Sequence, residues 1–225
     1  MKRTIFFASS IFAIALAFAM FNFNTTSNAS TLAAFADEFN SQAFEKTDET
    51  AGAYNFDRAH TYIGFRIKHL GLNEIPGAFR DFSGTINYDP KDVTKSSVEF
   101  SAKVTSVDTG IAPRDNHLRT ADFFEVEKFP EMTFKSTKVE KKGKNLLVTG
   151  DFTLKGVTKQ ITIPFTMLGS LKDQGGNMHI GIAATTVINR QDYGVSWSKK
   201  LDNGSLLVDD MVKVDLQIDA AMKKK

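Results

Sequence analysis

The sequence predicts an all-β protein whose strands are mostly antiparallel and are interrupted by one short helix. Three observations lead to this prediction. Apolar and polar residues alternate over seven stretches, turn residues separate these stretches, and one further stretch has helical spacing. Alternation with a period of two is typical of strands that bury one face and expose the other.

The seven alternating stretches follow one another along the chain, and with them we count about eight strands. They are residues 62–68, 98–104, 132–136, 146–155, 161–167, 180–188 and 212–218. The connections contain the glycine, asparagine, aspartate and proline that turns require, in LGLNEIPG, YDPKD, KKGKN, KGVTK, KDQGGN and LDNGS. Such strands can stack as a sandwich or close into a barrel, and closure removes exposed sheet edges.

One stretch, residues 113–124, has the features of a short helix. Pro113 suits a first helical position, and Asp115 falls in the first turn, where the helix dipole favours an acid. Asp115 and Arg119 are four residues apart, so we expect them to form an ion pair along the helix. The apolar side chains of this stretch are expected to lie against the sheet. They are Leu118, Ala121, Phe123 and Phe124.

The first residues, 1–29, are typical of a secretory signal peptide. A short basic start precedes an uncharged run over residues 5–23, and Ser27 and Ala29 are small residues where a signal peptidase needs them. We therefore expect cleavage after Ala29, with Ala36 as a second site. The alternative is an uncleaved membrane anchor, because the run is near the lower length limit for a span.

The remaining chain is divided into a linker over residues 30–50, a barrel domain over residues 51–220 and a basic tail over residues 221–225. Removing the signal peptide lowers Lys+Arg from 28 to 26, which equals the 26 Asp+Glu. A formally neutral protein offers no general attraction to nucleic acid. The chain has no cysteine, which excludes disulfides, a cysteine nucleophile and cysteine-ligated metal sites.

The sequence contains no recognisable motif for catalysis or for a metal site. Its four histidines form neither an H-x-H nor an H-E-x-x-H pair, and there is no G-x-S-x-G sequence. The glycines of GGNMHIG are not followed by the residues of a phosphate-binding loop. We therefore expect a protein that is not an enzyme and that holds no metal or cofactor.

Two features allow alternative interpretations from the residues alone. The charged residues 114–122 fit either a solvated helix face or a polar rim that meets the head group of a ligand. The apolar strand faces fit either an ordinary packed core or a tunnel for a lipid, since both require the same alternation.

Longer motifs carry a resemblance to a known family. They are YNFDRAHTYIGFRIKHLG, GAFRDFSGTINYDP, RDNHLRTADFFEVEKFPEMTFKST, VTGDFTLKGVTKQITIPF and TTVINRQDYGVSW. Together they resemble the bacterial YceI-like family of lipocalin-like proteins associated with polyisoprenoid binding, over roughly residues 53–219. The resemblance implies an eight-stranded antiparallel barrel with a long apolar cavity for an isoprenoid lipid, of quinone or polyprenyl type. It also implies a periplasmic protein that performs no chemistry.

From this interpretation we predict the residues that meet the ligand. The cavity wall is expected to include Ile63, Phe65, Ile67, Phe100, Phe134, Phe152, Phe165 and Ile182. The donors to a head group are expected among Arg114, His117, Arg119 and Arg190. We expect no stable membrane insertion after cleavage, and a homodimer through an edge strand or the Phe-rich linker is left open. The alternative functions are a dry barrel that acts as a protein interaction module in an envelope stress response, and a small-molecule enzyme.

Overall fold

The structure, a computed structural model, describes residues 50–199, 202, 204 and 206–222. The chain divides into two units, Met1–Ala43 and Phe44–Lys225, and all described residues belong to the second. The predicted signal peptide lies outside the described residues, and so does the predicted linker except for Thr50.

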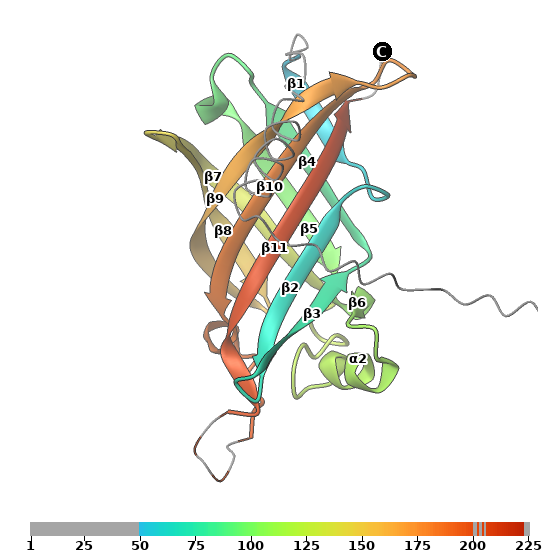
Figure 1. The fold of residues 1–225 in the computed structure, drawn as a ribbon, viewed down its shortest axis with the longest axis vertical. Coiled ribbons are helices and arrows are strands. Elements are labelled where there is room, and N and C mark those ends of the chain that lie inside the picture. Colours follow the sequence, from blue (N-terminus) through green and yellow to red (C-terminus); the bar gives the residue numbers. More distant parts are fainter. Residues whose placement is uncertain (1–49, 200–201, 203, 205, 223–225) are drawn as a thin grey trace, which may run out of the picture. The chain divides into compact units, whose positions relative to one another are not determined.

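The described chain consists mainly of strands (Figure 1). The strands are β1 (Gly52–Phe56), β2 (Tyr62–His69), β3 (Asn73–Phe79), β4 (Phe82–Tyr88), β5 (Ser97–Lys103), β6 (Val107–Asp108), β7 (Glu131–Lys142), β8 (Asn145–Leu154), β9 (Val157–Lys172), β10 (Met178–Asn189) and β11 (Val208–Met222). The helices are α2 (Ala112–Arg119) and the short 3-10 helices η1 (Val93–Lys95), η2 (Val104–Ser106) and η3 (Arg190–Tyr193). No helix in the described part of the chain is both long and apolar enough to span a membrane.

The eleven strand segments form eight barrel strands, because three of the barrel strands are interrupted. β1 and β2 both pair with β11. On its other side β1 pairs with β4, and β2 pairs with β3. β4 pairs in turn with β5, and β3 pairs with β6. Taking β1–β2, β3–β4 and β5–β6 as single strands, the order follows the chain and the ring closes on β11. The eight-stranded antiparallel barrel with one short α-helix is therefore confirmed.

The β2–β3 connection is shorter than the sequence LGLNEIPG predicted. Only residues 70–72 form the turn, and the following residues belong to β3, which was not among the predicted strands. β3 tolerates Pro76 because β2 pairs with it on one side, whereas β6 pairs only with Ala78 and Phe79 on the other. A proline at an unpaired strand edge removes no ladder hydrogen bond.

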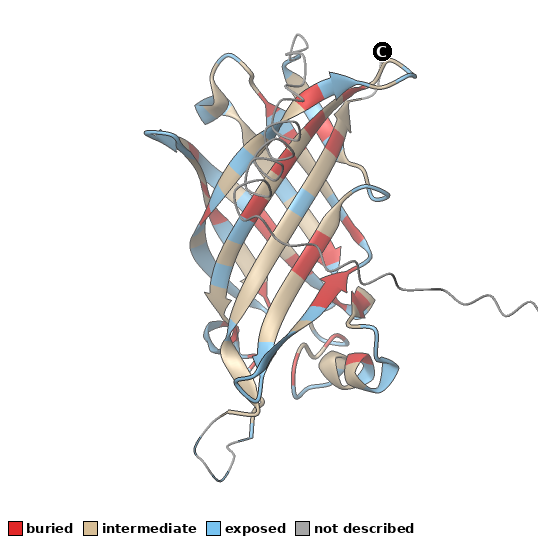
Figure 2. Cartoon of the chain, viewed as in Figure 1, coloured by how far each residue is buried: buried red, intermediate tan, exposed pale blue. Residues whose placement is uncertain are grey.

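The interior is filled at one end of the barrel, which we call the plug end. Five residues that we call the plug are buried there. They are Tyr54, Tyr88, Met178, Ile180 and Ala220. They come from β1, β4, β10 and β11, where these strands meet at the top of Figure 1, and Figure 2 shows the buried positions in red. The opposite end, beside α2, is called the helix end.

The barrel wall opens between β6 and β7 at the helix end, because β6 pairs with β3 and β7 pairs with β5. α2 and the residues after it cover this opening, with Phe123 and Val126 buried in the core and Leu118 packed against them. The helix ends at Arg119, earlier than predicted, because the backbone at the next residue is extended. Ala121 is therefore exposed and does not lie against the sheet as expected.

Candidate ligand cavity

The barrel encloses a cavity of about 630 Å³. This volume lies within the range of roughly 300–1,000 Å³ that is typical of small-molecule sites. Several inward-facing apolar side chains, such as Phe65, Val214 and Leu216, line the cavity and are only half-buried. The interior is thus hollow rather than completely packed, which the dry-barrel alternative did not expect.

All eight residues predicted for the cavity wall line this space. They come from β2, β5, β7, β8, β9 and β10, so the wall is built from around the barrel. The alternation continues along β11, where Val212 and Ile218 also line the cavity. The register of β7 shifts between Ser136 and Lys138, and this bulge brings Val139 to the inner face. Contact of these side chains with a ligand stays a prediction.

Glycines face three of the phenylalanines that line the cavity, and one of these pairs is Gly84 with Phe56. Gly77 pairs with Phe65 across β2 and β3, and a Cβ atom on Gly77 would lie 2.3 Å from the Cζ atom of Phe65. A Cβ atom on Gly150 would lie 2.6 Å from the Cζ atom of Phe134. Only glycine lets these rings lie along the wall, and rings that lie along the wall leave the middle of the barrel empty.

The mouth of the cavity lies at the helix end. None of the plug residues lines the cavity, and they close its other end. Among the described lining residues, the ones that are exposed to solvent are Lys68, His69 and Pro113. Lys68 and His69 end β2, and Pro113 lies in the first turn of α2, so solvent reaches the cavity between these elements.

Arg190 was predicted as a donor to a ligand head group, and it does line the cavity, but its donors are already occupied. The residue is buried, with its side chain 4% exposed. Its Nη1 donates to the Val195 carbonyl at 2.6 Å, its Nε to the Asp209 carbonyl at 2.8 Å and its Nη2 to the Asp210 carboxylate at 3.0 Å. Burial lowers the pKa of the Arg190 guanidinium, while the carboxylates of Asp210 and Asp209 act in the opposite direction.

Arg119 has a similar role and does not line the cavity. Its Nε donates to the Thr105 carbonyl and its Nη2 to the Val107 carbonyl, each at 2.8 Å. These carbonyls belong to η2 and β6, beside the opening in the wall. Arg119 therefore fastens α2 to an irregular strand and is placed away from any ligand in the cavity.

Arg114 lines the cavity but also bonds to the main chain. Its Nε donates to the Thr109 hydroxyl at 2.7 Å and its Nη2 to the Thr109 carbonyl at 2.8 Å. Asp115 is buried and accepts from the Thr109 amide at 2.9 Å, so the expected Asp115–Arg119 ion pair is wrong. The charges of this helix mainly hold local backbone, which neither interpretation of residues 114–122 anticipated.

His117 lines the cavity near its mouth. Its ring contacts Phe123 and Trp197 edge-on, with ring centroids 5.0 Å and 5.1 Å apart, and its Nε2 lies 2.7 Å from the Asp122 carboxylate. Sequence reasoning missed Trp197, because it follows the last 3-10 helix in a segment without strand alternation.

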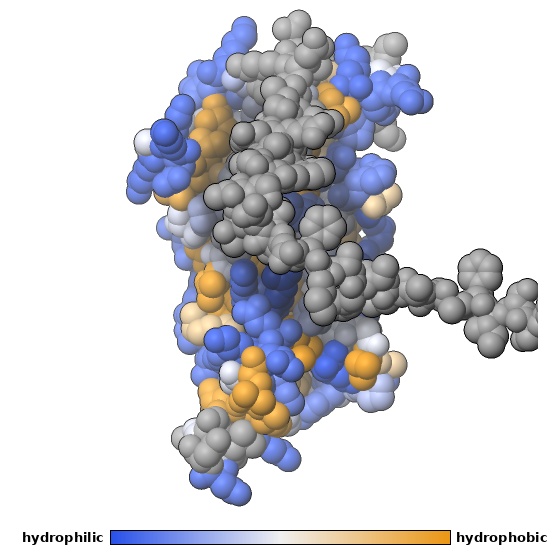
Figure 3. Space-filling view, viewed as in Figure 1, coloured by the Kyte–Doolittle hydropathy of each residue, from blue (hydrophilic) through white to orange (hydrophobic). Residues whose placement is uncertain are grey.

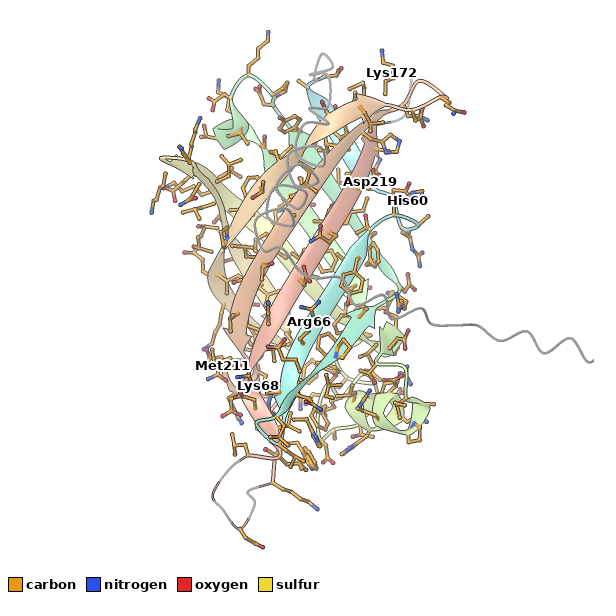
Figure 4. All side chains as sticks on the ribbon, viewed as in Figure 1. His60, Arg66, Lys68, Lys172, Met211 and Asp219 are labelled. Carbon is orange, nitrogen blue, oxygen red and sulfur yellow. The ribbon has the colours of Figure 1, made fainter. Side chains whose placement is uncertain are left out.

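Lys68 and His69 were also missed, because the alternation of β2 assigns Lys68 to the outer face. At the end of the strand both residues nevertheless line the cavity, and within the described residues neither side chain has a hydrogen bond or an ion pair. Lys68 therefore brings to the mouth a positive charge that is not paired within the described part of the chain, and His69 brings its ring nitrogens. Figure 4 shows Lys68 at the helix end of β2.

A second polar cluster lies at the plug end, outside the cavity. The Nδ1 of His179 lies 2.7 Å from the Asp219 carboxylate, and its Nε2 lies 3.5 Å from the Asp173 carboxylate. Burial acts to lower the pKa of His179, but the two carboxylates outweigh it and the pKa is raised. Figure 4 shows Asp219 close to His60. The hydrogen bond between His60 and Asp57 raises the pKa of His60. In the described part of the chain, no group of three or more histidine, aspartate or glutamate side chains is placed so that it could hold a metal ion.

Residues 54–220 match the YceI-like domain family. Protein YceI of Escherichia coli O17:K52:H18 is 40% identical over 159 residues, which are 70% of this chain and 83% of that protein. The crystal structure of a Campylobacter jejuni YceI protein is 32% identical and has a TM-score of 0.59, covering 75% of this chain and 96% of that one. A polyisoprenoid-binding domain from Saccharophagus degradans, implicated in plant cell wall breakdown, is 17% identical and has a TM-score of 0.56, covering 77% and 100% of the two chains.

Proposed function

The chain belongs to the YceI-like family, and from this premise and its cavity we propose that it binds and carries an isoprenoid lipid. The cavity is the observation that carries this proposal. Its wall is apolar over most of its surface, and it is closed at the plug end and wet at the mouth. Such a space accommodates a long apolar tail with its polar head group left near solvent.

The hydrophobic effect supplies the driving force for binding. An apolar tail in water costs about 25 cal/mol for each Å² of its surface, and that cost is recovered when the tail enters the cavity. Few polar groups of the wall need a partner, because the arginines that reach it are bonded to the protein itself. Lys68, His69 and His117 are the residues that we expect to meet a head group.

The choice of an isoprenoid among lipids rests on resemblance rather than on geometry. The Saccharophagus degradans domain is described as polyisoprenoid-binding, and its 17% identity extends to this chain only the fold. A quinone and a polyprenyl lipid both combine a methyl-branched tail with a polar end. Aromatic side chains such as Phe100 and Phe152 offer faces and edges against which branching methyls can pack.

We propose that the protein works in the periplasm after removal of residues 1–29. The support is the basic, apolar and small-residue order of the first 29 residues. N-terminal sequencing of the protein from a periplasmic fraction tests this proposal. A start at Ser30 or Asp37 is expected, and a protein found in the membrane fraction with its first residues intact would contradict it.

The central experiment identifies what the protein holds when it is made with its own leader. The protein is purified without detergent and examined by native mass spectrometry, and a second sample is extracted with organic solvent. We expect one isoprenoid lipid per barrel, and the same spectrum reports whether the protein is a monomer or a homodimer. An empty barrel that copurifies with a protein partner would support an interaction module instead, and turnover of an added metabolite would support an enzyme.

A further inference from the structure

Three large apolar side chains are exposed around the mouth of the cavity. Leu72 is 79% exposed, Ile111 is 52% exposed and Leu70 is 36% exposed. Leu70 and Leu72 belong to the β2–β3 turn, directly after two cavity-lining residues, and Ile111 precedes α2 between two others. Figure 3 shows apolar side chains gathered at this end of the barrel.

Leu70 occupies a backbone position that does not suit a leucine. Its φ is 57° and that of Gly71 is 69°, and the Leu72 amide donates to the His69 carbonyl at 3.0 Å. A tight turn whose two central residues both have positive φ angles favours asparagine followed by glycine at these positions. A β-carbon at positive φ is unfavourable, so this leucine stabilises neither the turn nor, being exposed, the core.

We propose that these three side chains, together with Lys68, form a rim that docks on the surface of a phospholipid bilayer. This inference rests on the proposed function for its purpose, because the rim would let a lipid pass between bilayer and cavity without crossing water. The docking itself does not depend on the identity of the lipid.

A water-insoluble tail resides in a membrane before it is bound, so a bilayer is the partner that both holds the ligand and matches exposed leucine and isoleucine. Apolar side chains flanked by a cation are typical of interfacial anchors, because the cation remains at the level of the lipid phosphates. Lys68 is exposed at the mouth and has no ion pair among the described residues. Glu74 lies on the same hairpin, so we expect the apolar side chains to contribute more than charge.

The test compares rim variants with a matched variant at the plug end. Leu70→Asn and Leu72→Ser are combined in one protein, and Leu171→Ser, at an exposed leucine of β9 near the plug, is the control. Binding to lipid-only vesicles of phosphatidylcholine with and without phosphatidylglycerol is measured by cosedimentation. The rate of extraction of a fluorescent polyprenol from such vesicles is measured separately.

We expect the rim double variant to bind vesicles at least about tenfold more weakly, since insertion of one leucine contributes a factor of about ten or more. Extraction should slow to a similar degree, while the amount of polyprenol held after loading from detergent stays unchanged. Leu171→Ser should behave as the unmodified protein does. The double variant should keep the melting temperature of the unmodified protein, because asparagine suits the turn and Leu72 is exposed, and this excludes unfolding as the cause of weaker docking.

Two results would overturn the inference. In the first, the unmodified protein does not bind lipid vesicles. In the second, the rim double variant binds vesicles and extracts polyprenol as well as the unmodified protein does. Failure of the proposed function gives a different pattern. In that case the unmodified protein binds vesicles and the rim variant does not, but neither retains polyprenol after loading from detergent.

Discussion

The two ends of the barrel use the same strands but fill the interior differently. At the plug end, Tyr54 and Ala220 are completely buried, and Tyr54 meets Tyr88 edge-on with centroids 6.2 Å apart. At the helix end the wall opens between β6 and β7, and the inward side chains leave a cavity. The comparison shows that one barrel can be sealed by packing at one end and kept open at the other.

The two ends also differ in their polar residues, because strand pairing is interrupted at the helix end. Where the ladders are regular, strands satisfy the backbone, as β1 does with β4 and β11. Where they are interrupted, buried carbonyls still need donors, and Arg114, Arg119 and Arg190 supply them. The arginines at the mouth therefore compensate for missing strand pairing, and their number indicates irregular backbone rather than a site for an anionic ligand.

The largest effect is expected from removing the charge that holds the helix end. Arg190→Met leaves the Val195 and Asp209 carbonyls and the Asp210 carboxylate without their donor. Breaking a buried pair costs about 3–5 kcal/mol, so we expect this loss in the free energy of unfolding by urea. Arg190→Lys should lose less, because it keeps the charge. If Arg190→Met lost less than about 1 kcal/mol, this residue would be free to serve a ligand instead.

A pair of truncations compares the packing of the two ends directly. Ile180→Ala in the plug creates a new cavity and should cost about 2–5 kcal/mol in the free energy of unfolding. Leu216→Ala removes a side chain that already borders empty space, so we expect a loss at the lower end of this range, about 2 kcal/mol. Both are measured by urea unfolding after lipid extraction. Equal losses would mean that the cavity is filled by the protein itself in solution.

A charge in the middle of the cavity should abolish ligand retention without unfolding the barrel. Phe100→Glu places a carboxylate beside Phe56 and Phe134, where burial of an unpaired charge costs several kcal/mol. We expect at least about a 100-fold loss of bound lipid in native mass spectra. Phe100→Leu is the control and should retain the lipid. A folded Phe100→Glu protein with its full complement of lipid would show that the ligand binds elsewhere.

The smallest effect is expected at the plug end and depends on pH. The raised pKa of His179 means that folding stabilises its charged form. This contribution is complete below the unfolded pKa of about 6.5 and is lost as the pH rises through the higher folded pKa. His179→Gln should therefore lower the free energy of unfolding more at about pH 6 than at about pH 9.

His60→Gln is measured alongside as a reference, because the pKa of His60 is also raised and its charge also contributes to the pH dependence. Lipid retention should not change in His179→Gln, since His179 lies outside the cavity. A stability difference that stayed constant with pH would show that His179 contributes through packing rather than charge.

Much of the fold and of the cavity wall could be predicted from the sequence. Alternation with a period of two marked the inner face, and all eight residues predicted from it line the cavity. The pattern missed β1, β3, β4 and β6, of which β6 has only two residues and β3 contains Pro76. It also misjudged Arg119, because spacing along a helix shows which side chains are near but not which carbonyls lack a donor.

The sequence by itself determined a series of mostly antiparallel strands and the inner face of the seven alternating stretches, because these depend on local alternation and turns. Closure into a barrel rather than a sandwich was implied only by the family resemblance, and the strand pairing of the structure decides it. The tertiary structure alone decided that the interior is hollow, that Lys68 and His69 lie at its mouth and that the arginines are occupied. The physical reason is that empty volume is the difference between the space inside the closed barrel and the side chains that point into it. That difference depends on residues from every strand at once, and no local pattern contains it.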